Sequence, residues 1–239
     1  MKRFYDEVSI RRVESDGSGA GWQVTLDGRG LKTVKGTAQI VPTQALAQAL
    51  AAEWDSQSED LDPATFPIRD MTDYAIDVVG TDPAAAAEKI LSYGDTDTLL
   101  YRADPDEPLY ARQIEVWEPI VSAFEMNEGV ELVRVSGIIH RPQKDETFAK
   151  LRIRLGDHSP FALAGIELMT SLAASLVVGL AASETHDQAG ALALWQAASL
   201  EEEWQADLWG REEEAEERRA KRQSDFLKAR EATRLAIIG

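Results

Sequence analysis

Apolar and polar residues alternate with a period of two through the first forty residues, and this pattern predicts strands. Two stretches rich in Gly and Asp, at residues 15–21 and 27–30, interrupt the alternation and predict turns. Strands joined by short turns pair antiparallel, so we expect a β-meander. The alternating apolar positions are Val8, Ile10, Trp22, Val24, Leu26, Leu31, Val34 and Ile40.

The periodicity changes from that of a strand to that of a helix at Thr43. Leu46, Leu50 and Trp54 recur every four residues, and Thr43 can cap a helix that begins at about residue 44. The segment 58–67 contains two prolines and several acids, which is typical of a connector. We therefore predict an α+β protein with two domains. Residues 1–66 form an antiparallel sheet with a helix, and residues 67–239 form a mainly helical bundle.

Most of the second domain is predicted to be helical. At residues 82–83 and 159–160, a capping side chain precedes a Pro at the first helical position, which is a typical helix start. A helix that contains Trp117 also contains Pro119, which must kink or restart it. Residues 130–139 are rich in β-branched side chains and predict either a short strand or a loop.

An apolar run extends from Phe161 to Ala182 and carries one charged residue, Glu167. Its length is that of a membrane span. Its many small residues, the lack of flanking Lys or Arg and the buried charge favour a central helix of the bundle instead. We expect no membrane insertion.

Composition limits the functions that are open to the chain. It has no Cys, which excludes disulfides, thiol nucleophiles and iron–sulfur clusters. The net charge of −17 makes nucleic acid and anionic membranes poor partners. The start of the chain becomes acidic before an apolar segment develops, so no secretory signal is predicted.

Candidate catalytic residues are few. His140, His158 and His186 lack metal-ligand spacing and are expected at the surface, so we predict no metal and no cofactor. Asp95 and Asp97 match the D-x-D-x-T nucleophile loop of haloacid-dehalogenase-type phosphotransferases. The residues before them continue a helix rather than a buried strand, which favours a helix-capping role. A phosphotransferase that uses this pair stays as the alternative function.

A third group of candidates lies on a helix predicted from about residue 187. On this helix Glu201 borders the packed face, Glu203 lies farther round and Glu202 lies almost opposite. Trp209 falls away from the stripe that holds Trp204, and an aromatic on a second side fits either two-sided burial or a protein interface. The stripe consists of Ala197, Leu200, Trp204 and Leu208.

Several motifs occur in the order seen in one family. The chain resembles the assembly chaperones of F-type ATP synthase that attend the alpha subunit of its catalytic head. The resemblance extends from about Phe4 to Gly210, and the charged segment 211–222 departs from it. That segment is expected to form a solvated helix with Glu–Lys and Glu–Arg pairs four residues apart. The motifs are residues 53–57, 95–98, 101–102, 117–120, 165–167, 200–205 and 209–210, together with Gln113.

The resemblance implies a chaperone, not an enzyme, that holds the unassembled alpha subunit and shields its apolar interface from aggregation until beta subunits replace it. It further implies a monomer in the bacterial cytoplasm, or in the mitochondrial matrix for eukaryotic relatives. It implies an important acidic residue in the helical region, for which Glu201 is the candidate. Together with Glu203 and Trp209 of the same predicted helix, Glu201 is expected to bind the partner. Those that it implies as structural members of the motifs are Trp54, Asp97, Trp117 and Trp204.

Overall fold

The computed structural model describes residues 1–15, 19–137 and 139–237. The chain divides into two compact units, each built from separate stretches of sequence. Unit 1 consists of Met1–Pro83, Ser159–Gly165 and Lys228–Gly239, and unit 2 consists of Ala84–His158 and Ile166–Leu227. This division does not follow the boundary that we predicted after residue 66, because it assigns residues 67–83 and two later segments to unit 1.

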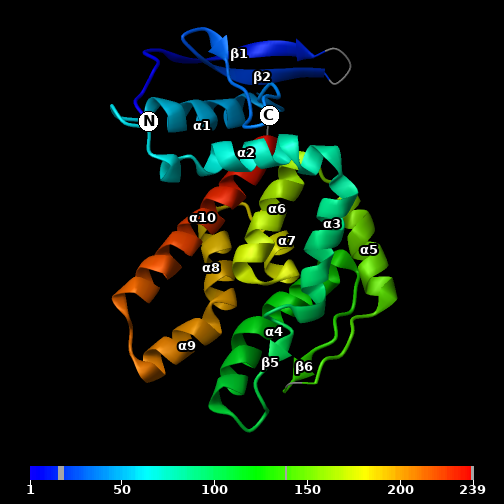
Figure 1. Ribbon diagram of the computed structural model, residues 1–239. Helices are drawn as coiled ribbons and strands as arrows, with labels where there is room; N and C mark the ends of the chain where they lie inside the picture. The colour runs from blue at the N-terminus through cyan, green and yellow to red at the C-terminus, as the bar shows by residue number, and fades with distance from the viewer. Residues whose placement is uncertain (16–18, 138, 238–239) are drawn as a thin grey trace. The chain divides into compact units, whose positions relative to one another are not determined.

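The sheet of unit 1 is antiparallel, as the alternating pattern predicted (Figure 1). β2 is the central strand, and it pairs with β1, β3 and β4. Residues 16–18 of the predicted first turn lie outside the described part of the chain. In the second turn, Asp27 and Gly28 have φ angles of 48° and 75°, a conformation that Gly and Asp tolerate. The strands are β1 (Val8–Ser15), β2 (Gly19–Leu26), β3 (Arg29–Gly30) and β4 (Ile40–Val41).

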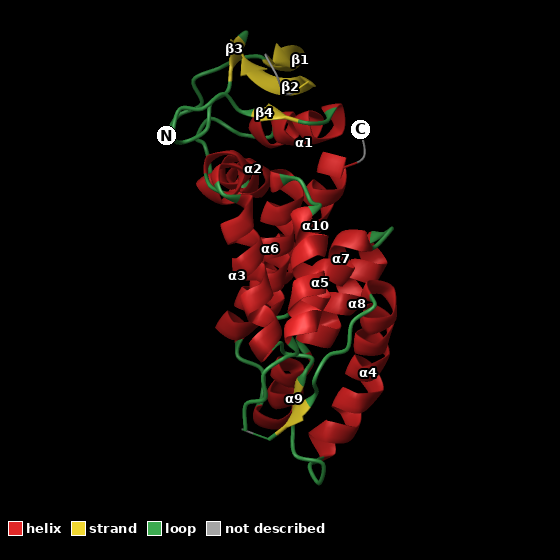
Figure 2. Ribbon diagram, turned by 90° about the vertical axis from the view of Figure 1, so that its right-hand side faces the viewer, coloured by secondary structure: helices red, strands yellow, loops and turns green. Residues whose placement is uncertain are grey.

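Helix α1 packs against β1 and β2 and covers one face of this sheet (Figure 2). It begins where the sequence predicted, because the Thr43 hydroxyl accepts a hydrogen bond from Leu46 N at 3.1 Å. The Thr43 hydroxyl also donates to Leu235 O at 2.5 Å and so joins α1 to the end of α10. The helices of this part are α1 (Gln44–Asp55), η1 (Pro63–Thr65), α2 (Pro67–Asp77) and η2 (Val79–Thr81).

Gly165 allows α6 and α10 to approach closely within unit 1. A Cβ atom at residue 165 would overlap the Thr233 hydroxyl oxygen and would lie 3.1 Å from Thr233 Cβ and 3.3 Å from Ala229 O. Thr233 is fully buried, so it has little freedom to move aside. The Gly in the motif at residues 165–167 therefore has a packing role.

Unit 2 is mainly helical, which confirms the α+β class. Helix α4 continues through Pro119, so the alternative of a restarted helix was wrong. The predicted strand at residues 130–139 is reduced to β6, which pairs in parallel with β5. The elements that lie wholly or partly in unit 2 are α3 (Pro83–Ser92), η3 (Tyr93–Thr96), β5 (Tyr101–Arg102), α4 (Pro108–Glu128), β6 (Val135–Ser136), α5 (Asp145–Gly156), α6 (Pro160–Ala173), α7 (Leu176–Glu184), α8 (Gln188–Ala198), α9 (Leu200–Trp209) and α10 (Glu213–Ile237).

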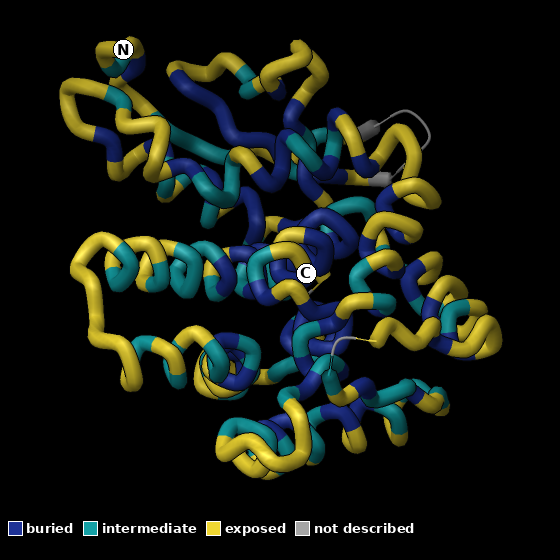
Figure 3. The backbone as a smooth tube through the Cα atoms, turned by 60° about the horizontal axis from the view of Figure 1, so that its bottom comes forward, coloured by how far each residue is buried: buried dark blue, intermediate teal, exposed yellow. Residues whose placement is uncertain are grey.

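The apolar run 161–182 forms two helices rather than the single helix that we predicted. α6 ends before Ala174, whose φ of 47° leaves the helical region, and Ser175 caps α7 by accepting from Val178 N at 3.0 Å. Both helices are largely buried, as expected. Buried segments run through the interior of the chain, and exposed ones lie at its outer turns (Figure 3). None of the helices in the described residues is both long enough and apolar enough to span a membrane.

Candidate functional site

Helix α9 holds the three residues that we predicted for partner binding, Glu201, Glu203 and Trp209. The helix predicted from residue 187 through residue 208 is broken at Ser199, which ends α8 and precedes α9. The wheel drawn for one continuous helix was therefore wrong. Among its described residues, α9 has none that is fully buried, so it is a surface element of unit 2.

Glu201 is turned toward the protein rather than toward solvent. Its Oε1 accepts a hydrogen bond of 2.5 Å from Nε2 of Gln113, which is itself fully buried. Burial raises the pKa of Glu201, and the hydrogen bond from Gln113 opposes that rise. Gln113 Oε1 in turn accepts from Ala103 N at 2.8 Å, so Glu201 is linked to the loop before α4. Sequence reasoning placed Gln113 and Glu201 in separate motifs and missed that they bond.

Glu203 is paired with cations of the same unit. Its carboxylate lies 2.8 Å from Arg211 Nη2 and 3.8 Å from Arg219 Nε. Arg211 also binds Asp207 at 2.7 Å, and these carboxylates raise the pKa of its guanidinium. Glu202 makes a similar pair with Arg222 at 2.8 Å. The charged segment after Gly210 thus supplies arginines that pair with Glu202 and Glu203 of α9.

Trp209 is 86% exposed at the end of α9, and its neighbour Leu208 is 64% exposed. Trp204, on the same helix, is half-buried. Burial of a large aromatic side chain is favourable, so an exposed one gains stability when a partner covers it. Such residues are enriched at protein interfaces. Trp209 and Leu208 are therefore the apolar part of the candidate partner surface, and the acids beside them form its rim.

Asp97 supports the turn between α6 and α7. It is fully buried, and its two carboxylate oxygens accept from Leu99 N at 2.9 Å and from Val177 N at 3.0 Å. Burial raises its pKa to about 6, against the hydrogen bonds that favour the charged form. The Thr98 hydroxyl donates to Ala174 O at 3.0 Å. Asp97 thus caps a helix, but one eighty residues away instead of the next one along the chain.

This geometry does not favour a phosphotransferase site. A nucleophile loop needs exposed carboxylates at the end of a strand. Asp95 lies in η3, and both oxygens of Asp97 are committed to backbone N–H groups. No cluster of three or more metal-binding side chains occurs in the part of the chain that the structure describes.

Trp54 and Trp117 are core residues of separate units. Trp54 packs against Tyr5 and Phe66 in unit 1, with ring centroids 5.6 and 4.7 Å apart. Trp117 is fully buried in unit 2 and donates from Nε1 to Ala197 O at 2.7 Å. Both therefore hold the fold together.

Comparison with known proteins gives consistent matches. Residues 2–125 match the family described as ATP12 chaperone protein. The crystal structure of Atp12 from Paracoccus denitrificans is 34% identical, with a TM-score of 0.87, and 98% of each chain is covered. A single-substitution variant of that protein matches with the same identity and TM-score, over 98% of this chain and 97% of the other.

The Atu1473 protein, a chaperone candidate from Agrobacterium tumefaciens, is 36% identical with a TM-score of 0.89. The match covers 98% of this chain and 85% of the other. At this coverage the aligned region includes the charged segment after Gly210.

Proposed function

The chain belongs to the ATP12 family of chaperones for ATP synthase assembly, and we propose that its client is the unassembled alpha subunit of the F-type enzyme. It covers the apolar surface that the alpha subunit later buries against beta subunits. Obligate interfaces are more apolar than ordinary protein surface, and exposing one before assembly invites aggregation. If the chaperone and the beta subunit bind overlapping surfaces of the alpha subunit, the beta subunit can displace the chaperone without ATP. We expect the chaperone to act as a monomer, and in a bacterium to act in the cytoplasm.

The observation that carries this proposal is the exposed end of α9. Trp209 and Leu208 offer an apolar contact, and the paired acids of α9 keep that contact soluble. The net charge of −17 has the same effect on the chaperone as a whole, because it opposes association of the client-bound complexes with one another.

Co-expression with the alpha subunit tests the proposal. The chaperone should form a complex with the alpha subunit and keep it in the soluble fraction. Trp209→Ser should weaken this complex without changing the melting temperature, because the side chain has almost no intramolecular contact to lose. Ile153→Ser is the matched control, since Ile153 is also exposed, at 70%, but lies on α5. Unchanged aggregation of the alpha subunit at excess chaperone would refute the proposal.

The role of Glu201 needs variants that separate charge from structure. Glu201→Gln keeps an oxygen that can accept from Gln113 but removes the negative charge. Glu201→Lys removes both. If the carboxylate acts on the client, both variants should weaken capture. If only Glu201→Lys weakens capture, and its melting temperature falls as well, Glu201 is a structural residue.

A further inference from the structure

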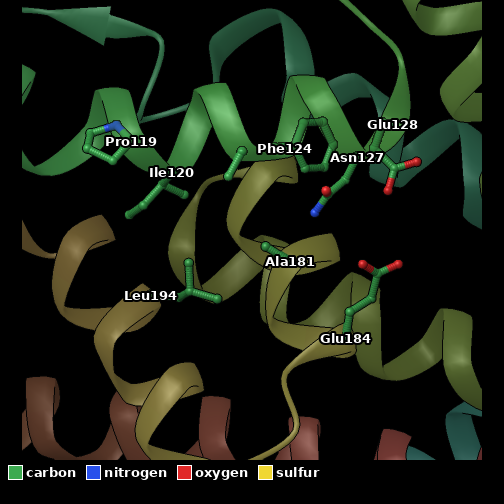
Figure 4. Close-up of a pocket in the computed structure, with 9 residues that line it drawn as sticks. Pro119, Ile120, Phe124, Asn127, Glu128, Ala181, Glu184 and Leu194 are labelled. Carbon is green, nitrogen blue, oxygen red and sulfur yellow. The ribbon is translucent and has the colours of Figure 1, made fainter.

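An apolar groove lies between α4, α7 and α8 of unit 2, with a cavity volume of about 300 Å³ (Figure 4). Most of the residues that line it are apolar. This volume is at the lower end of the range for ligand pockets, about 300–1,000 Å³, so it has room for one or two side chains rather than for a protein surface. The residues that line it are Pro119, Ile120, Ala123, Phe124, Asn127, Glu128, Ala181, Glu184 and Leu194.

The groove is charged at one end only. Pro119 and Ile120 lie at one end, and the carboxylates of Glu128 and Glu184 lie together at the other (Figure 4). Both carboxylates share one cation, because Arg154 contacts Glu184 directly and its Nε lies 3.7 Å from Glu128 Oε2. Two negative charges against one positive charge leave this end with a net charge of −1.

Glu128 is the less well compensated of the two carboxylates. Its side chain is only 10% exposed. Burial raises its pKa, the charge of Glu184 adds to the rise, and Arg154 offsets it in part. A second cation beside Glu128 would complete the neutralisation of a carboxylate that is already largely out of water.

We propose that this groove receives an apolar side chain of the client, and that Glu128 pairs with a Lys or Arg about one helical turn from that side chain in the client's sequence. This inference rests on the proposed function and specifies a segment of the client that the chaperone holds. The apolar floor selects an aliphatic or aromatic side chain, and the charge at the end selects against an acidic neighbour.

Site-directed photocrosslinking tests the position of the client. The chain contains no Cys, so Ala123→Cys provides a single attachment point for benzophenone maleimide at the groove. Ala149→Cys is the matched control, because Ala149 is exposed on α5 and does not line the groove. With the alpha subunit as the client, we expect crosslinks from Ala123→Cys only. The crosslinked peptide should contain an apolar residue with Lys or Arg within about one turn.

Affinity measurements test the energetic role of the groove. Ala123→Trp fills it, and the dissociation constant for the alpha subunit should rise about tenfold or more, whereas Ala149→Trp should change it less than about twofold. Glu128→Gln keeps the side-chain volume but removes the negative charge. It should therefore weaken binding and make binding less dependent on salt.

Several outcomes would overturn the inference. These are equal crosslinking from both positions, a crosslinked peptide that lacks a basic residue, and a chaperone dimer crosslinked without client. If Ala123→Trp binds the alpha subunit with unchanged affinity, the groove is excluded but the proposed function stands. If the unmodified chaperone forms no complex with the alpha subunit, the proposed function fails, and this inference fails with it.

Discussion

Replacing Gly165 with Ala should destabilise unit 1, although Ala is the better helix former. The added Cβ would overlap the hydroxyl oxygen of the fully buried Thr233 and would lie 3.1 Å from its Cβ. Overpacking of a core costs about 1–3 kcal/mol, and an overlap with a rigid β-branched side chain should be near the upper end of this range. Ala is favoured over Gly in a helix interior by about 1 kcal/mol. The net expectation is a loss of about 2 kcal/mol in the free energy of unfolding.

A double-mutant cycle with Thr233→Ala tests this cause. Thr233→Ala alone should cost about 1 kcal/mol, since its hydroxyl donates to Ala229 O at 2.8 Å. In the double variant the overlapping atom is gone, so the cost of Thr233→Ala is offset by the higher helix propensity of Ala at residue 165, and the total cost should be less than about 1 kcal/mol. The coupling energy between the two sites is then about 2–3 kcal/mol, well above the few tenths found for independent sites.

Urea titration followed by circular dichroism gives the four free energies of the cycle. Gly156→Ala is the matched control, because a Cβ there would have no neighbour within 4 Å and the change should be neutral or slightly stabilising. If Gly165→Ala stabilises the protein, or if the two substitutions add within about 0.5 kcal/mol, close packing at Gly165 is not the reason for the glycine.

Three further predictions concern buried or half-buried groups. Asp97→Ala leaves the N–H groups of Leu99 and Val177 without their acceptor and should cost about 2–4 kcal/mol, measured by urea titration; a loss below about 1 kcal/mol would contradict its role at the turn. The half-buried carboxylate of Glu53 accepts hydrogen bonds from Ile68 N and Arg69 N at 2.8 and 2.9 Å. Burial outweighs these bonds and raises the pKa of Glu53 to about 7, above its value in the unfolded chain, so its contribution to stability should fall by about 2–3 kcal/mol as pH rises from 4.5 to 7. Glu53→Gln should flatten that part of the stability–pH curve, and an unchanged slope would refute the assignment. Trp54→Arg should lower the free energy of unfolding by several kcal/mol, because it places an unpaired cation in the core, and a variant that melts like the parent protein would exclude that burial.

The sequence was sufficient to predict those elements whose structure is determined by residues close together in the chain. Thr43 and the spacing of Leu46, Leu50 and Trp54 predicted the start and the buried face of α1, and both are confirmed. The alternation in the first forty residues likewise predicted the antiparallel sheet. Each of these features depends on residues within a few positions of one another.

The predictions failed where the structure is determined by residues that are far apart in the sequence. The apolar run breaks at Ala174 because Asp97 and Thr98 bind the turn from eighty residues earlier. The position of Glu201 was predicted from a helical wheel for one continuous helix, but the chain forms two helices, α8 and α9, that meet at Ser199. The partner of Glu201, Gln113, could be found only in three dimensions, although both belong to the motifs that carried the resemblance.

The discontinuity of unit 1 along the chain has a consequence for biosynthesis. The segment Lys228–Gly239 completes this unit and follows Pro83 by roughly 150 residues, which a ribosome adds at about 5–20 residues per second. For about 8 to 30 seconds the nascent unit therefore lacks the segment of α10 that supplies Ala229 and Ala232 to its core. During that interval this chaperone is itself an incomplete protein with exposed apolar surface, subject to the same hazard as the client that we propose for it.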